Sequence, residues 1–264
     1  MRSHRFRDVV GVMAATAIVC SGAVVASAAS ATASASASPT SRSVSAVGTY
    51  QARFTPGTPS QLVVSADTAF SKNEGTFSFT NFGDTGSWVI SGSTISMIVT
   101  TSAHGDKGIV LIGTVAAIGI TPGNYGLPGF AYGFWSAKRS TAARRTSRNG
   151  SSIIGARRTV PVRPTAKAKG IYAAHFPDFA QSDTLTISND VPNTHEGTFA
   201  LSTFGDSGNW VVMGKHFAMG VLTGINAGYA FVGTLTSTGI NSFATPGRIG
   251  VPGAGTFRWY ATKA

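Results

Sequence analysis

Hydrophobic and polar residues alternate with a period of two along most of the chain after residue 47. Phe77 and Phe79 flank a serine, and Ile95, Met97 and Val99 share one parity. This alternation is typical of antiparallel strands with one buried face. Glycine, proline, asparagine and aspartate separate the runs at short intervals, as turn residues do. No stretch in this part has the 3.6-residue period of an amphipathic helix, so the pattern predicts an all-β fold.

The first half of the chain contains seven or eight predicted strands. They cover residues 48–54, 61–66, 75–82, 87–91, 94–100, 108–116, 117–121 and 130–137. Short connections between neighbouring strands are typical of an antiparallel meander, and closure of a meander into a β-barrel removes its exposed edges. We therefore expect antiparallel meander barrels, with a two-sheet β-sandwich as the alternative.

An internal repeat divides the chain into two copies of one domain. Residues 74–97 and 196–219 are identical at 12 of 24 positions without a gap. The likeness continues outward, since GTYQARF near the start of the first copy is matched by GIYAAHF in the second. Each copy has about 90 residues, enough for one modest core. We expect tandem barrels over 48–138 and 170–264, each folding on its own.

One motif shared by the copies has the composition of a tight turn. FGDTGSW at residues 82–88 returns as FGDSGNW at residues 204–210. Aspartate and glycine supply the dihedral angles and local hydrogen bonds of a hairpin, so the motif predicts the turn between the third and fourth strands. Four carboxyl groups occupy matching positions in both copies, and we expect them at strand ends: Glu74, Asp84, Glu196 and Asp206.

The N-terminal residues have the pattern of an export signal. A basic start is followed by an apolar run that closes on Ala26-Ser27-Ala28, which predicts a helical signal peptide over residues 1–28 with cleavage after Ala28. An uncleaved membrane anchor is the alternative, because the run approaches spanning length. Cys20 lies within it, so the mature chain has no disulfide. Residues 29–47 are Ala/Ser-rich and are expected to be disordered. The protein is predicted to be secreted or associated with the cell envelope.

Most of the positive charge lies between the two copies. The chain has 21 Lys and Arg against 10 Asp and Glu, but residues 138–169 hold ten of these bases, no acid and no aromatic ring. Residues 139–169 are therefore predicted to be a flexible basic linker. Anionic wall polymer or an anionic membrane surface is the expected partner. Specific nucleic-acid binding is not expected, because stacking rings are absent. The predicted contact residues are Arg144, Arg145, Arg148, Arg157, Arg158, Arg163, Lys167 and Lys169.

A protease-like motif in the second copy is interpreted as a coincidence. GDSG and AAHF resemble segments of chymotrypsin-like serine proteases and would make Ser207 the nucleophile and His175 the base. The two residues are close in sequence within one small repeat, whereas that fold draws the pair from two barrels. The first copy also has Thr85 and Arg53 at these positions. No histidine pair has metal-ligand spacing. We expect no catalytic residues, no metal and no cofactor.

The barrel interiors are the remaining candidate site. An eight-stranded barrel is wide enough either for its own side chains or for one small ligand. The many large inward residues favour a filled interior, and Gly113 and Gly233 are expected to let an aromatic ring lie against the strand. If a small apolar ligand enters instead, the expected lining residues are Tyr50, Trp88, Trp135, Tyr172, Trp210, Tyr229 and Trp259.

The order of motifs resembles one group of bacterial proteins. GTY, then EGTF…GD(T/S)GxWV, then (I/V)GT…GI and a terminal TFRWYATKA are similar to small secreted β-barrel proteins of Gram-positive, high-GC bacteria. More distantly they resemble calycin-like barrels, the lipocalin and avidin group. The resemblance implies a meander barrel and an extracellular location. No residue of avidin's biotin site has a counterpart in this sequence.

These observations predict a secreted, non-enzymatic binding or envelope-associated protein with two duplicated β domains. The alternative is a calycin-like carrier of a small apolar ligand. A hydrolase is the third hypothesis, resting on the GDSG and AAHF segments alone.

Overall fold

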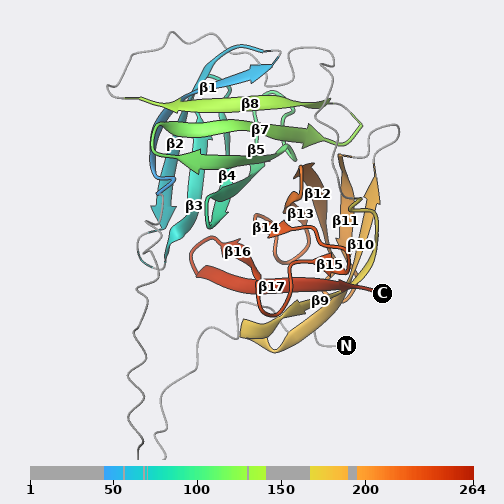
Figure 1. Ribbon diagram of the computed structural model, residues 1–264. Helices are drawn as coiled ribbons and strands as arrows, with labels where there is room; N and C mark the ends of the chain where they lie inside the picture. The colour runs from blue at the N-terminus through green and yellow to red at the C-terminus, as the bar shows by residue number, and fades with distance from the viewer. Residues whose placement is uncertain are drawn as a thin grey trace, which may run out of the picture. The chain divides into compact units, whose positions relative to one another are not determined.

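The computed structural model describes residues 45–55, 57–67, 69, 71–129, 131–140, 167–189 and 195–264. The predicted signal peptide, and the Ala/Ser-rich segment as far as residue 44, lie outside these residues. Antiparallel strands dominate this part of the chain, as the period-two pattern predicts (Figure 1). Among the described residues, no helix is long and apolar enough to cross a membrane.

The first copy forms a closed barrel of eight strands in sequential order. Every strand pairs with its neighbours in the chain, and β1 closes the ring by pairing with β8, where Phe54 lies opposite Trp135. The predicted meander barrel is therefore confirmed, and the β-sandwich alternative is wrong. The strands are β1 (Gly48–Thr55), β2 (Ser60–Asp67), β3 (Ser71–Phe79), β4 (Asp84–Ser91), β5 (Thr94–Thr101), β6 (Val110–Ala116), β7 (Gly119–Leu127) and β8 (Ala131–Arg139).

The second copy forms a second closed barrel of the same kind. Its ring runs through β9, β10, β11, β12, β13, β14, β16 and β17, and closes where β17 pairs with β9. The short strand β15 pairs with β17 alongside this ring, and a 3-10 turn, η2 (Pro177–Phe179), joins β9 to β10. The strands are β9 (Gly170–Phe176), β10 (Gln181–Asn189), β11 (Glu196–Leu201), β12 (Asp206–Met213), β13 (His216–Thr223), β14 (Ala230–Thr234), β15 (Gly239–Ile240), β16 (Gly247–Val251) and β17 (Gly255–Lys263).

One strand of the first barrel is divided in the second. Strand β7 continues through TPGNYGL, with a register shift between Ile120 and Gly123. The second copy inserts Asn-Ser-Phe-Ala at residues 241–244 at the equivalent point, and its strand is split into β15 and β16. The predicted strand at 117–121 was therefore too short, because a bulge lets β7 continue past Pro122, although proline is typical of turns.

The predicted hairpin turn lies slightly earlier than expected. Residues 80–83 form the turn, so only Phe82 and Gly83 of the FGDTGSW motif belong to it. Gly83 has a φ of 70° and Gly205 a φ of 68°, which explains the glycine in both copies. The remaining residues of the motif start β4 and β12.

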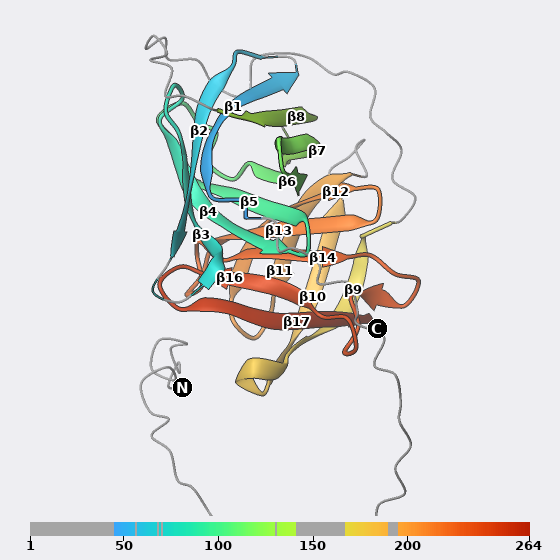
Figure 2. The same cartoon turned by 60° about the vertical axis from the view of Figure 1, so that its left-hand side comes forward.

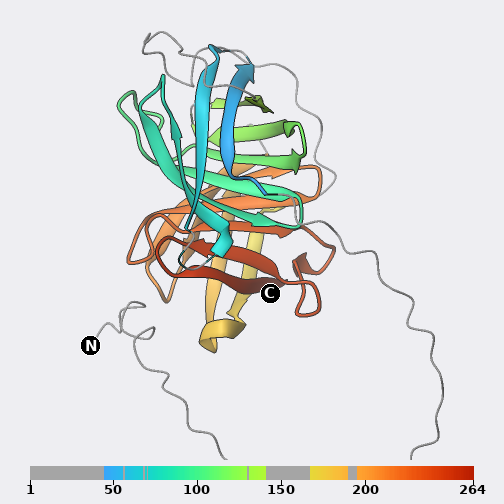
Figure 3. The same cartoon turned by 90° about the vertical axis from the view of Figure 1, so that its left-hand side faces the viewer.

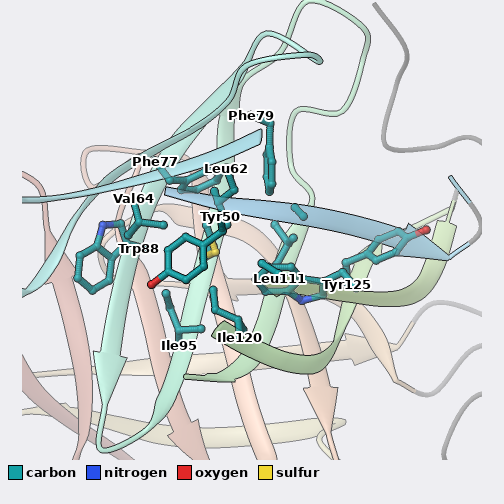
Figure 4. Close-up of a cluster of buried hydrophobic side chains, with 14 of the residues drawn as sticks. Tyr50, Leu62, Val64, Phe77, Phe79, Trp88, Ile95, Leu111, Ile120 and Tyr125 are labelled. Atoms are coloured by element: carbon teal, nitrogen blue, oxygen red, sulfur yellow. The ribbon is translucent and has the colours of Figure 1, made fainter. Parts of the chain in front are cut away.

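Each barrel encloses its own hydrophobic core. In the first barrel, inward side chains from all eight strands form one buried cluster, ten of whose members are labelled in Figure 4. Phe54 packs against Phe79, with the ring centroids 5.4 Å apart, and against Tyr125 at 5.7 Å. In the second barrel, Phe231 meets Trp259 edge to face at 5.3 Å. Both interiors are filled by side chains of the chain itself.

A third hydrophobic cluster joins the outer faces of the two barrels. Strands β4–β6 of the first barrel lie against β12–β14 of the second, as Figures 2 and 3 show. The outward side chains of these strands are fully or almost fully buried: Val89, Ile98, Val110, Ile112, Val211, Ala218, Ala230 and Val232. The sequence predicted two barrels that fold independently, and it did not predict this interface between them.

Candidate functional site

The four tryptophans predicted to line a ligand site are buried, and their polar atoms are occupied. Trp88 Nε1 donates to the carbonyl oxygen of Ser65 at 2.9 Å, and Trp210 Nε1 donates to that of Ser188 at 2.9 Å. Both indoles are 0% exposed. Each tryptophan therefore ties its own strand to the backbone of another strand in the barrel wall, in matching places of the two copies.

The other two tryptophans lie on the last strand of each barrel, Trp135 on β8 and Trp259 on β17. Trp135 Nε1 donates to the carbonyl oxygen of Ile112, and Trp259 Nε1 to that of Val232, both at 3.0 Å. A β-carbon on Gly113 would lie 3.3 Å from the ring of Trp135, so the prediction that this glycine admits an aromatic ring is confirmed. At Gly233 the nearest atoms to such a β-carbon belong to the side chain of Asn241, from the inserted segment.

The predicted tyrosines divide into two kinds. Tyr50 donates its hydroxyl proton to the carbonyl oxygen of Ala46 at 2.5 Å, and Tyr172 makes the same bond to Ala168 at 2.6 Å. The Arg139 guanidinium lies 5.1 Å above the Tyr50 ring and also donates to its hydroxyl. Tyr229 differs, since it is half-buried beside the start of β14 and packs against the core of the second barrel.

Most of the predicted anion-binding residues lie outside the described part of the chain. Lys167 and Lys169 are described, and both are exposed just before β9. At the other end of the segment, the Ser140 backbone N–H donates to Thr49 and holds the chain against β1. The six arginines from Arg144 to Arg163 fall among residues 141–166, outside the described residues.

The residues of the protease-like motif are not brought together. Ser207 is on β12, where its hydroxyl is 2.6 Å from that of Thr223. His175 is on β9, where Nδ1 is 3.0 Å from the Ser182 hydroxyl and the ring stacks on Tyr260 at 4.7 Å. Two strands, β10 and β11, separate β9 from β12 in the sheet. The described geometry therefore does not pair Ser207 with His175.

The carboxyl groups shared by the copies are buried, although charged side chains are normally exposed. Asp84, Asp206 and Glu196 begin strands as expected, whereas Glu74 lies within β3. All four are 2% exposed or less. An ionised carboxylate loses much hydration free energy when it is buried, so such groups are either hydrogen-bonded or protonated.

The aspartates at the start of β4 and β12 have different partners in the two copies. In the second barrel, Asn226 Nδ2 donates to Asp206 Oδ2 at 2.6 Å. Burial raises the pKa of Asp206, and the hydrogen bonds from Asn226 oppose this rise. In the first barrel the equivalent neighbour is the buried Asp106. Burial raises the pKa of Asp84 to about 6; the Ser102 hydroxyl lowers it, and Asp106 raises it further. A carboxyl pair in one copy replaces a carboxyl–amide pair in the other.

The glutamates lie at the interface between the barrels, in equivalent positions. A β-carbon on Gly250 of β16 would lie 3.1 Å from Cβ of Glu74, and one on Gly126 of β7 would lie 2.9 Å from Cβ of Glu196. Gly126 and Gly250 are themselves equivalent, in GLPG and GVPG. Burial, with the nearby charge of Asp67, raises the pKa of Glu74 to about 7. Each glutamate therefore packs against a glycine of the other barrel.

Polar groups cross the same interface. Asn209 Nδ2 donates to the carbonyl oxygen of Gly108 at 2.8 Å, and Asn124 Nδ2 donates to that of Val212 at 2.8 Å. Thr94 Oγ1 and His216 Nδ1 are 3.2 Å apart. Burial, with Lys215 nearby, lowers the pKa of His216. The continuous apolar runs in β5, β6 and β12 are the sequence signal for this interface, because strands buried on both faces lose their alternation.

Among the described residues, no three His, Cys, Asp or Glu side chains gather as metal ligands would. No family model, curated protein or solved structure matches the chain. The resemblance to secreted and calycin-like barrels therefore depends on the sequence motifs alone.

Proposed function

We propose that this chain is an exported, non-enzymatic binding protein of the cell envelope. In this account the two barrels form one supporting unit, and the basic segment between them contacts an anionic polymer or membrane surface. The observation that carries the proposal is that both barrel interiors are packed with the chain's own side chains, while eight bases without an acid lie between β8 and β9.

The filled interiors favour binding on the outside of the barrels. A ligand inside the first barrel would have to displace Trp88 or Trp135, both 0–1% exposed and hydrogen-bonded to backbone carbonyls. Removing such a ring from its hydrogen bond and its packing contacts opposes binding. The apolar carrier therefore requires a rearrangement that external binding does not.

The charge distribution supports the basic segment as the contact. Outside residues 138–169 and the first 28 residues, eight bases face nine acids, so the copies themselves are close to neutral. Each Lys or Arg near an anionic surface can contribute about 1 kcal/mol at low salt. Eight bases from Arg144 to Lys169 are enough for strong attraction that salt weakens.

A salt titration of binding to isolated cell walls and to phosphatidylglycerol vesicles tests the proposal. The wild-type protein should cosediment at low salt and be released steeply toward physiological salt. Replacing the eight bases from Arg144 to Lys169 by serine should abolish binding, while replacing the six arginines among them by lysine, as the matched control, should preserve it. Binding that ignores salt, or that survives in the serine variant, would contradict the proposal.

A further inference from the structure

We infer that the outer face of the first barrel selects the second barrel and excludes another copy of the first barrel, through Ile98 and Gly220. The inference concerns the surface that joins the copies and does not depend on the proposed function. It follows from the near-symmetry of the interface and from one position at which the symmetry is broken.

Equivalent residues of the two copies contact each other across the interface. Thr94 and His216 are separated by 122 positions and are in hydrogen-bond contact, and Ile98 and Gly220 are separated by the same number. In a twofold arrangement, only residues close to the axis touch their own equivalents. Because β5 and β13 make two such contacts across the interface, the pseudo-twofold axis runs along these two strands.

Contacts away from the axis occur in matching pairs, as twofold symmetry requires. Glu74 lies against Gly250 as Glu196 lies against Gly126. Asn209 lies against Gly108, and the equivalent Ser87 lies 3.9 Å from the β-carbon position of the equivalent Gly228. The tandem therefore has the interface of a symmetric dimer, contained within one chain.

At the axis the two copies differ in size. Ile98 is 0% exposed, and a β-carbon on Gly220 would lie 2.5 Å from its Cγ1 and closer still to its Cβ. The isoleucine side chain thus occupies the space that the glycine leaves open. Two first barrels paired in the same way would bring two isoleucines into that space, whereas two second barrels would leave it empty. Overpacking and cavities both destabilise, so the mixed pair is favoured.

The test uses the full chain, folded first and then cut at a protease site engineered into residues 141–166. The cut protein is mixed with cut protein that carries an affinity tag on its first barrel, and the mixture is left to exchange. The tagged first barrel should capture the second barrel and no untagged first barrel. Capture of untagged first barrel by the wild-type protein would overturn the inference.

Three variants make the test specific to this position. Gly220→Ile should weaken capture roughly 10- to 100-fold. The exchange of both residues, Ile98→Gly with Gly220→Ile, should restore most of the capture, because the filled and open positions are simply interchanged. Ile98→Gly in the untagged protein alone should let its first barrel be captured by the tagged wild-type first barrel, because an isoleucine then meets a glycine again. Near-wild-type capture by Gly220→Ile would overturn the inference. An exchange variant that captures no better than Gly220→Ile would also overturn the inference. The loss of capture would then come from isoleucine in β13 itself and not from its clash with Ile98.

Discussion

Asn226 donates a hydrogen bond to Asp206 in the second barrel at 2.6 Å, and the equivalent pair in the first barrel is Asp106 with Asp84. An amide can donate to a buried carboxylate at any pH, whereas a second carboxyl can do so only when one of the pair is protonated. The duplication thus contains both versions of one buried polar pair.

Replacing Asp106 by asparagine should stabilise the protein at neutral pH. The folded-state pKa of Asp84 is about 6, above its ordinary 3.8, so its favourable contribution is complete below pH 3.8 and is lost as the pH rises through 6. Asp106→Asn should raise the free energy of unfolding by roughly 1–3 kcal/mol at pH 7.5 and by little at pH 4. Urea unfolding at the two pH values measures the difference. The mirror variant Asn226→Asp should be destabilised at pH 7.5, and equal stability of all three proteins there would contradict this explanation.

Glu74→Gln should remove a pH dependence that comes from the interface. Glu74 is 0% exposed, neither carboxyl oxygen has a hydrogen-bond partner among the described residues, and its neighbours include Asp67, Val89 and Gly250. Its pKa is raised from 4.5 to about 7, so stability should be highest below pH 4.5 and should fall as the pH rises to 7, by on the order of 3 kcal/mol. Thermal melts from pH 4.5 to 8 should show this fall in the wild type and a flatter profile in Glu74→Gln. Parallel profiles would place the pH dependence elsewhere.

Ser96→Ala should stabilise the interface. Ser96 lies on β5 between Thr94 and Ile98, is 0% exposed, and its hydroxyl has no hydrogen-bond partner in the described part of the chain. The second copy has Ala218 at the equivalent position. Removing an unsatisfied buried hydroxyl should gain about 1 kcal/mol in chemical unfolding. Ala218→Ser is the matched control and should lose stability, and a loss in Ser96→Ala would contradict the prediction.

Trp88 should contribute to stability through both packing and its hydrogen bond. Trp88→Ala should lower the free energy of unfolding by roughly 3–5 kcal/mol, as expected for a large buried ring. Trp88→Phe retains most of the ring but leaves the Ser65 carbonyl without its indole donor, so it should lose less than Trp88→Ala. Trp210 offers the same comparison in the second barrel. A Trp88→Ala protein of unchanged stability would show that the ring is not part of a packed core.

Local pattern predicted the strands and the filled interiors, since each inward residue alternates with an outward one in strands such as β1 and β10. The repeated motifs also predicted a second barrel, because similar sequences fold alike. The interface was missed because it depends on which outer faces meet, and no short-range pattern specifies that. In β5 both faces are buried, and the outward Ile98 is one more apolar residue in a strand already rich in them. The sequence of β5 therefore does not distinguish the interface residue from the core residues beside it. The burial of Glu74 was missed for the same reason, since a carboxyl group in isolation predicts exposure.

The most direct test of the central claim, that the barrels are filled and that recognition is external, is a titration with the neutral apolar probe N-phenyl-1-naphthylamine. A neutral probe avoids attraction to the basic segment. The account predicts no saturable binding to the native protein and no energy transfer from Trp88, Trp135, Trp210 or Trp259. Saturable binding of one or two probe molecules per chain, with energy transfer from these tryptophans, would contradict it and would support the carrier hypothesis.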